Sequence, residues 1–367
     1  MQALADDTRV RRLIPRAGVD FASNDYLGLA GSDRLARAVM RAMTEGVPVG
    51  AAGSRLLRGN TEAQENFEQQ AAAFFGAESA LGLGGGYVAN FALLSTLPQR
   101  GDLLLMDELS HASTHEGARS TRAETAHFRH NDATHAADVI TGWRRGGGRG
   151  AVWICVESLY SMDGDRAPLA DLAELADVHG FLVVDEAHAT GVFGPQGRGL
   201  AHDLEGRDNV LTLHTLGKAL GGSGALICGP KLLRDFMVNR SRPFIFATAP
   251  SPLMAVAGSE ALAILQDEPQ RQTALHDLIS HFNQGLAARL PHLPPSGSQI
   301  VPLIVGENAA AVALAQRVQA QGFDLRAIRP PTVPQGTARL RVSLTLNASP
   351  QDVTRLLDTL EELWPDL

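Results

Sequence analysis

The sequence has few cysteines and no long apolar run, and each absence excludes a class of protein. Among its 367 residues only Cys155 and Cys228 are cysteines, and both lie in apolar stretches. Neither has the CxxC spacing of zinc or redox sites, so we expect two buried, inert thiols. No apolar run reaches the ~18 residues of a membrane helix, and the N-terminus lacks an apolar signal core. These features predict a cytoplasmic protein.

Lysine is also scarce. Of the 32 basic residues only Lys218 and Lys231 are lysines, and the others are arginines. A lysine can lose its proton and act as a nucleophile, whereas an arginine stays charged. The near-absence of lysine therefore favours a chemical role for one of the two that are kept.

The chain has fewer basic than acidic residues, with a formal net charge of −8 and a pI near 5.8. Such a surface repels phosphate backbones and anionic lipid headgroups. We therefore expect neither a nucleic acid nor a membrane as a partner. The balance of 44% hydrophobic and 20% charged residues is that of a folded, soluble protein, and the length exceeds one typical domain of ~150 residues.

Apolar, β-branched runs alternate with helical periodicity in the first two thirds of the chain. The runs rich in strand formers are 103–106, 151–156, 181–184, 210–213 and 225–228. Pro168–His179 has the spacing of an amphipathic helix, and Asn60-Thr61 with Gln64 predicts a capping box at another helix start. The alternation predicts an α/β fold with a mostly parallel central sheet and helices on both faces. In such sheets ligands bind beyond the carboxyl ends of the strands.

We expect three parts along the chain. Residues 1–30 form an N-terminal arm that ends in SNDYLGL, and 31–265 form the large α/β domain. From about residue 266 the pattern changes, with helical periodicity at 275–290 and 309–321, strand-like runs at 300–305 and 339–344, and a final helix. Residues 266–367 are therefore expected to form a small α+β domain.

The sharpest motif is Asp185-Glu186-Ala187-His188, which directly follows the apolar run FLVV, with Lys218 further on in TLGKALGG. The acidic pair could be a solvated strand end, or the DEAH of a nucleotide-hydrolysing enzyme. A P-loop is excluded because Gly217-Lys218 is followed by Ala219 and has Thr212 at the first glycine position. A dinucleotide fingerprint is weak, since Tyr87 replaces its third glycine.

Pyridoxal phosphate chemistry needs an amine for a Schiff base, a carboxylate for the pyridine nitrogen, backbone amides for the phosphate and a flat group over the ring. Lys218 and Asp185 provide the first two, and Gly84–Tyr87 can expose amides at a helix start. His111, in DELSHAS, can stack on the ring; its alternatives are a helix cap or a zinc ligand with His115. We predict no metal site.

Several motifs together resemble the α-oxoamine synthase family of fold-type-I pyridoxal phosphate transferases, from about Asp20 to the C-terminus. They are SNDYLGL, GSRLLRGN, GGYVAN, DELSHAS, ESLYSMDGD, VVDEAHATG, TLGKALGGSG and RPPTVPQGTARLR. The chain departs from the family at Gln64, where histidine is common, and in its shorter N-terminal arm.

The resemblance implies a role for each matching residue. The catalytic set would be Lys218 as Schiff-base lysine and acid/base, Asp185 at the pyridine nitrogen and His111 on the ring. Further contacts to pyridoxal phosphate would come from Gly86, Tyr87, Ser161, His188, Thr215 and, from a second subunit, Thr248. Arg11, Asn24, His111 and Arg341 would bind the substrates.

The implied reaction is the decarboxylative condensation of L-alanine with a pimeloyl thioester on coenzyme A or acyl carrier protein, the biotin-synthesis branch of the family. Alternatives are a glycine C-acetyltransferase, a 5-aminolevulinate synthase, a serine palmitoyltransferase, a quorum-signal synthase, or a scaffold that has kept the fold without catalysis. The resemblance also implies a homodimer with shared active sites.

Overall fold

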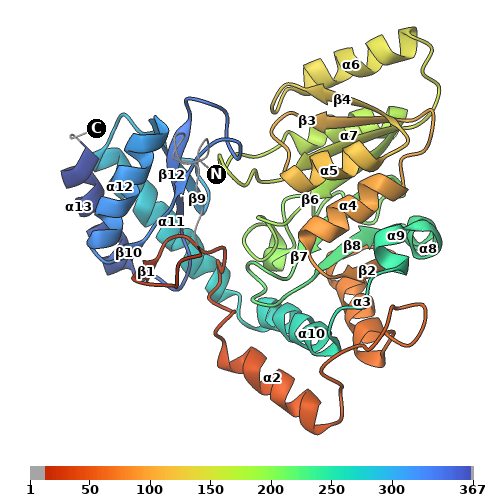
Figure 1. Ribbon diagram of the computed structural model, residues 1–367, viewed down its shortest axis with the longest axis horizontal. Helices are drawn as coiled ribbons and strands as arrows, with labels where there is room; N and C mark the ends of the chain where they lie inside the picture. Colours follow the sequence, from red (N-terminus) through yellow and green to blue (C-terminus); the bar gives the residue numbers. More distant parts are fainter. Residues whose placement is uncertain (1–12, 365–367) are drawn as a thin grey trace. The chain divides into compact units, whose positions relative to one another are not determined.

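A seven-stranded sheet organises the first of two compact units, residues 29–160 and 166–269, in the computed structural model, which describes residues 13–364 (Figure 1). Its strand order is β2-β8-β7-β6-β5-β3-β4, and only β8 runs against its neighbours. The strands are β2 (Ser79–Leu83), β3 (Leu103–Asp107), β4 (Glu124–Phe128), β5 (Val152–Glu157), β6 (Gly180–Asp185), β7 (Val210–Thr215) and β8 (Ala225–Gly229).

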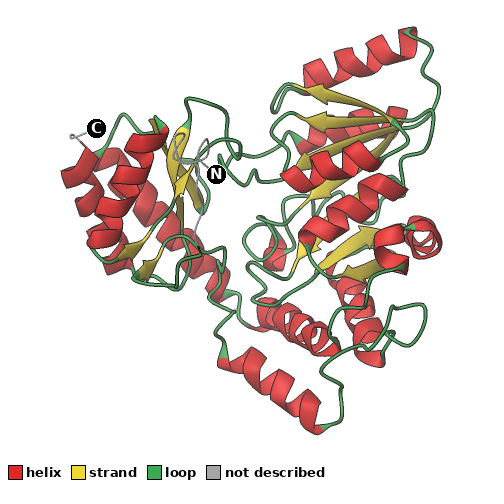
Figure 2. Ribbon diagram, viewed as in Figure 1, coloured by secondary structure: helices red, strands yellow, loops and turns green. Residues whose placement is uncertain are grey.

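Helices cover both faces of this sheet, as Figure 2 shows. The helices of this unit are α2 (Asp33–Thr44), α3 (Glu62–Phe75), α4 (Gly86–Thr96), α5 (Ala112–Ser120), α6 (Ala133–Arg145), α7 (Leu169–His179), α8 (Lys231–Arg240), α9 (Arg242–Ile245) and α10 (Pro252–Asp267), with a short 3₁₀ turn at Pro195–Gly197. Successive strand residues face opposite sides. On β3, Leu104 and Met106 join the core under α4, whereas Leu103 and Leu105 join the core under α6 and α7.

The predicted α/β class is confirmed, and the expected strand runs correspond to β3, β5, β6, β7 and β8. The capping box also exists, because the Thr61 backbone N–H donates to Gln64 Oε1 at 3.0 Å. Cys155 and Cys228 are buried free thiols, and burial raises the pKa of each above its ordinary value. Two strands of this sheet, β2 and β4, were not predicted.

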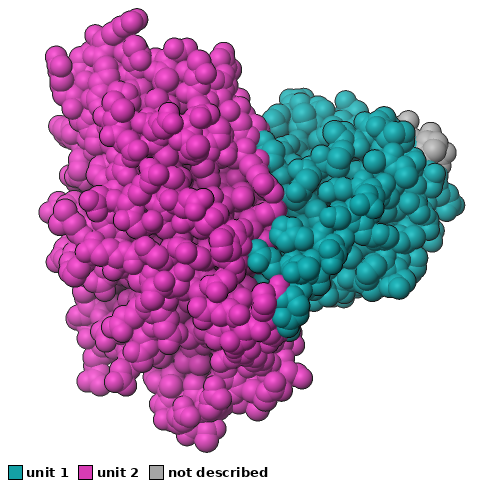
Figure 3. All heavy atoms as spheres, turned by 180° about the vertical axis from the view of Figure 1, so that it is seen from behind, with its two compact units in different colours: residues 1–28, 161–165, 270–367 teal, residues 29–160, 166–269 magenta. Residues whose placement is uncertain are grey.

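The second unit comprises the described residues 13–28 together with 161–165 and 270–364 (Figure 3). It has a three-stranded antiparallel sheet ordered β11-β12-β9 and a short parallel pair, β1 with β10. Its elements are β1 (Val19–Asp20), α11 (Gln270–Arg289), β9 (Ile300–Gly306), α12 (Asn308–Ala320), β10 (Phe323–Asp324), β11 (Ala327–Ile328), β12 (Ala338–Ser343) and α13 (Pro350–Leu363). The division expected from the sequence, at residues 30 and 265, remains a proposal.

The short segment 161–165 packs against the strands of the second unit. Gly164 has φ +71°, and a Cβ there would lie 2.1 Å from the Ile300 carbonyl oxygen. Only glycine permits this approach and this backbone conformation. Arg339 of β12 binds Asp163 and the Met162 carbonyl on the same segment. These contacts fix the backbone of Ser161 within the unit.

No helix in residues 13–364 is long and apolar enough to cross a membrane.

Candidate active site

The polar residues singled out in the first unit lie at or after the carboxyl ends of parallel strands. His111 comes after β3, Asp185 ends β6, and Lys218 follows β7. The Gly84–Gly86 turn follows β2, which runs parallel to these strands because both it and β7 are antiparallel to β8. The carboxyl ends of all four strands therefore meet at one edge of the sheet, where α/β proteins bind ligands.

Lys218 is held by a histidine at this edge. Its Nζ lies 2.8 Å from His188 Nε2, and His188 has an exposed fraction of 5%. An amine and an imidazole at this separation share a hydrogen bond, which limits the positions of the lysine side chain. The structure thus brings together two of the residues predicted from the sequence.

Asp185 is buried and has two hydrogen-bond donors. Its Oδ1 accepts from the backbone N–H of Ala187 at 2.9 Å, and its Oδ2 accepts from Asn90 Nδ2 at 2.6 Å. A carboxylate can accept only, so both contacts have their natural direction. Together they fix the plane of the carboxylate at the end of β6.

His111 lies at the start of α5 and caps it, since its Nδ1 accepts from the backbone N–H of Ser113 at 3.2 Å. The same Nδ1 is 2.7 Å from Ser113 Oγ. Desolvation lowers the pKa of His111 below its ordinary value; Lys218 acts in the same direction, and Asp185 opposes it. The neutral imidazole is therefore favoured. Within residues 13–364 no three His, Cys, Asp or Glu side chains gather as a metal site.

The start of α4 offers an open cradle for a phosphate. Added Cβ atoms at Gly84 and Gly85 would meet nothing within 4 Å, and one at Gly86 would lie 3.7 Å from Thr215 Oγ1. The first backbone N–H groups of a helix have no hydrogen-bond partner within the helix, so they can donate to an anion at its N-terminus. Gly86, Tyr87 and the Thr215 hydroxyl therefore fit a phosphate group. With Lys218 and Asp185 on the same edge, the residues present fit pyridoxal phosphate.

The loop between α9 and α10 carries Thr248 and is hydrogen-bonded to Gln64. Thr248 is exposed in the loop between α9 and α10, next to Phe246, which is 70% exposed. Gln64 Nε2 donates to the Pro250 carbonyl at 2.8 Å, while its Oε1 caps α3. The glutamine that departs from the family pattern thus anchors the loop that carries Thr248.

The second unit brings its own predicted residues together. Arg341 is 7% exposed, and its Nε donates to the Ser161 carbonyl at 2.6 Å. Its Nη2 donates to Asn24 Oδ1 at 3.2 Å. The guanidinium is therefore held beside Asn24 and Ser161. Arg11 lies outside the described residues.

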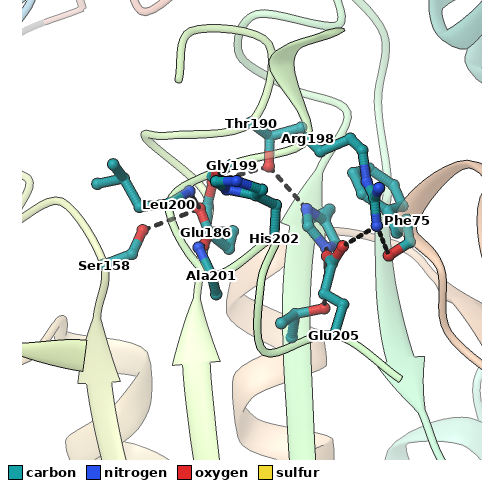
Figure 4. A network of polar contacts seen from close by, with 12 residues as sticks. Phe75, Ser158, Glu186, Thr190, Arg198, Gly199, Leu200, Ala201, His202 and Glu205 are labelled. Atoms are coloured by element: carbon teal, nitrogen blue, oxygen red, sulfur yellow. Dashed lines mark hydrogen bonds and ion pairs between the residues drawn. The ribbon is translucent and has the colours of Figure 1, made fainter. Parts of the chain in front are cut away.

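Glu186, next to Asp185, is the centre of a buried polar network (Figure 4). Its Oε2 accepts from Ser158 Oγ at 2.9 Å and from the Leu200 N–H at 3.1 Å, and its Oε1 accepts from the Ala201 N–H. Burial outweighs these donors and raises the pKa of Glu186 to about 7. The side chain ties the 198–201 loop to the end of β6.

A second part of the network supports β7 (Figure 4). Thr190 Oγ1 donates to the Glu186 carbonyl and lies 2.8 Å from His214 Nδ1. His214 Nε2 is 3.2 Å from Glu205 Oε1, and Glu205 pairs with Arg198 at 3.1 Å. His214 immediately precedes Thr215, so these contacts hold the strand that leads to Lys218.

Three residues with a part in this geometry were not predicted from the sequence. Glu186 was noted only as part of the acidic pair, and Asn90 and Ser113 only as letters of the GGYVAN and DELSHAS motifs. Asn90 had a usable signal, because it is a polar residue in the otherwise apolar helix run VANFALL. Ser113 had none.

Comparison with known proteins gives consistent matches over nearly the whole chain. The model of the aminotransferase class I and II family matches residues 16–360. An 8-amino-7-oxononanoate synthase of Anaeromyxobacter dehalogenans is 42% identical over 355 residues, 96% of this chain and 88% of that protein. One of Chromobacterium violaceum is 40% identical over 348 residues, 94% of this chain and 89% of that protein.

Solved structures agree. A serine palmitoyltransferase of S. paucimobilis with a bound PLP–myriocin aldimine superposes with a TM-score of 0.88 at 25% identity, over 100% of this chain and 96% of that one. The 8-amino-7-oxononanoate synthase of Francisella tularensis gives 0.80 at 25% identity, over 95% and 98%. The chain therefore belongs to the class I and II aminotransferase family, as an α-oxoamine synthase whose cofactor is pyridoxal phosphate.

Proposed function

We propose that this chain is an acyltransferase that condenses L-alanine with a pimeloyl thioester, releasing carbon dioxide and the free thiol of the acyl carrier and forming 8-amino-7-oxononanoate for biotin synthesis. The observation that carries the proposal is Lys218 Nζ beside His188, on the sheet edge that also holds Asp185 and His111. The relatives at 40–42% identity, named 8-amino-7-oxononanoate synthase, support this choice of substrates.

Bound pyridoxal phosphate supplies an electron sink for negative charge at the α-carbon of an amino acid. We assign the proton transfers to Lys218: its Nζ takes the proton from the α-carbon of alanine and returns one after decarboxylation. His188 keeps Nζ in place through the 2.8 Å contact. The Asp185 carboxylate would hold the pyridine nitrogen, and an opposite charge at ~4 Å would be worth about 4 kcal/mol there at an effective dielectric of ~20.

The remaining assignments concern binding. Gly86, Tyr87 and Thr215 hold the phosphate, and His111 covers the ring. His188 and Ser161 bind the ring hydroxyl, while Asn24 and Arg341 bind the substrate carboxylate. The support for the last pair is their direct contact at 3.2 Å within the second unit. Arg11, which lies outside the described residues, is assigned to the acyl chain on the resemblance alone.

A second candidate is an α-oxoamine synthase that joins serine to a long acyl thioester. The observation in its favour is that a serine palmitoyltransferase gives a TM-score of 0.88, against 0.80 for the Francisella tularensis enzyme. Both structures are 25% identical to this chain, whereas the relatives named 8-amino-7-oxononanoate synthase reach 42%. Sequence identity therefore favours the first candidate.

Turnover with a panel of substrates tests the choice. L-alanine, glycine and L-serine are each combined with acetyl, succinyl, pimeloyl and palmitoyl thioesters, on coenzyme A and on acyl carrier protein, and carbon dioxide and aminoketone are measured. We expect the largest kcat/KM for L-alanine with pimeloyl thioester. A larger value for serine with palmitoyl thioester would establish the second candidate. For the preferred acyl group, comparing kcat/KM on coenzyme A with kcat/KM on acyl carrier protein identifies the natural carrier.

Cell fractionation tests the predicted cytoplasmic location.

We also propose a homodimer in which Thr248 of one chain reaches the phosphate site of the other. The exposure of Thr248 and of Phe246 beside it supports coverage by a second copy, and most soluble homo-oligomers have two-fold symmetry. Inactive Lys218→Ala is mixed with Thr248→Asp, whose added charge repels the phosphate. Heterodimers are expected to regain activity, because one of their two sites has both residues intact. Verified heterodimers without recovery would place Thr248 in the site of its own chain.

A further inference from the structure

Asn90 is a buried amide with an incomplete set of hydrogen bonds. It lies on α4 with 1% of its surface exposed, and its Nδ2 donates to Asp185 Oδ2 at 2.6 Å and to Ser113 Oγ at 3.1 Å. Its Oδ1 is buried and has no hydrogen-bond partner among the described residues. A buried polar oxygen without a partner destabilises a protein. A contribution to stability is therefore a poor reason for an asparagine at this position. Its hydrogen bonds to Asp185 and Ser113 are a better one.

The orientation of this amide follows from its neighbours. Oxygen and nitrogen of an asparagine have nearly the same shape, so the hydrogen-bond pattern decides between them. The atom that faces the acceptor-only carboxylate of Asp185 must be the donor, Nδ2. The second hydrogen of Nδ2 then lies towards Ser113 Oγ. Asn90 is thus a donor to both groups.

The direction of donation continues from Ser113 to His111. Because Ser113 Oγ accepts from Asn90, its own hydrogen is free for His111 Nδ1, 2.7 Å away. The Ser113 backbone N–H donates to the same Nδ1 at 3.2 Å. A nitrogen that accepts two donors carries no hydrogen, so a neutral His111 has its hydrogen on Nε2.

We propose that Asn90 is a positioning residue that orients the Asp185 carboxylate and, through Ser113, holds His111 as its Nε2–H tautomer. One buried amide thereby couples the group proposed for the pyridine nitrogen with the group proposed for the ring face. The inference rests on the proposed function for the roles of Asp185 and His111 towards the cofactor, but the hydrogen-bond relay itself is a property of the chain alone.

Two readouts separate positioning from a purely structural role. The first is the visible absorption of the pyridoxal phosphate holoenzyme titrated with pH, together with kcat and KM. The variant is Asn90→Leu, which keeps the shape and removes the amide, and Asp185→Asn is the reference for a lost carboxylate. Asn283→Leu is the matched control, because Asn283 Oδ1 in α11 is also buried and has no hydrogen-bond partner within residues 13–364.

We expect Asn90→Leu to lower kcat by about tenfold or more, the effect of one hydrogen bond to a charged group, with KM for the amino acid within about twofold. Its absorption titration should shift in the same direction as that of Asp185→Asn, whereas Asn283→Leu should match the wild type. A titration of Asn90→Leu that coincides with the wild type would overturn the proposal.

The second readout is the tautomer of His111 in the cofactor-free protein, from ¹⁵N histidine spectra assigned with His111→Gln. We expect Nε2–H in the wild type, and a smaller proportion of this tautomer in Asn90→Leu and in Ser113→Ala, in which the backbone N–H of residue 113 remains the one fixed donor to Nδ1. Asn90→Ala, a smaller change that also removes the amide, serves the same test if Asn90→Leu does not fold. An unchanged tautomer in the variants overturns the relay. Because this spectrum needs no turnover, failure of the substrate panel with a shifted tautomer would refute the proposed function and support the relay.

Discussion

Lys218→Ala is expected to abolish covalent attachment of pyridoxal phosphate and to lower turnover by about 10⁴-fold or more. Alanine has no amine, so neither the Schiff base nor the proposed proton transfers can occur. Borohydride reduction of the wild-type holoenzyme, followed by peptide mapping, should place the label on Lys218, and the variant should take no label.

The matched control is Lys231→Ala, which removes the only other lysine. Lys231 starts α8 with 61% of its side chain exposed and pairs with Asp235 one turn on. Such exposed pairs contribute ~0.2–1 kcal/mol, so attachment and turnover should remain near wild type. Label on Lys231, or full activity of Lys218→Ala, would refute the assignment of the Schiff-base lysine.

The parts of the fold that could be predicted are those in which burial alone decides the sequence pattern. β3, β5, β7 and β8 are buried along their whole lengths and β6 is buried from Leu182 on, so their sequences are apolar runs. β4, with the sequence ETAHF, lies at the sheet edge with most of its residues exposed, so it lacks the signal. β2, at the other edge, has Gly82, where the glycine weakens the strand pattern. The local sequence of β8 does not indicate that this strand runs antiparallel to its neighbours.

The candidate site could be predicted where a residue follows a strand, and not where its role depends on a distant partner. Asp185 and Lys218 were found because functional residues follow parallel strands. Asn90 and Asp185 are 95 positions apart, and no local sequence pattern predicts the hydrogen bond between them. The contact of Arg341 with Asn24 spans 317 positions. The motif resemblance suggested both residues, but their direct contact became visible only in the fold.

Glu186 predicts how stability should change with pH. Its pKa is raised by burial from 4.5 to about 7 in the folded chain. Between these values the folded state keeps a proton that the unfolded state has released, so the stabilisation present below about pH 4.5 is lost as the pH rises through about 7. The difference of about 2.5 units corresponds to about 3 kcal/mol in the free energy of unfolding.

Glu186→Gln should remove this pH dependence, because an amide does not titrate. Its own stability at low pH should be lower than that of the wild type, since either placement of its NH₂ group faces a backbone N–H donor, that of Leu200 or that of Ala201. The gap between the two proteins should therefore be largest near pH 4.5 and shrink by about 3 kcal/mol by about pH 7.5. The other titrating groups are shared and cancel in the difference.

Urea unfolding of both proteins at matched concentration and in the same cofactor state, at intervals from pH 4.5 to 8, measures this gap. The control is Glu174→Gln, which removes an exposed carboxylate on α7; its curve should stay parallel to that of the wild type. If the curve of Glu186→Gln also stays parallel, Glu186 titrates alike in the folded and unfolded chains. In that case its three donors would balance its burial, and the network around β6 would hold an ionised carboxylate throughout this pH range.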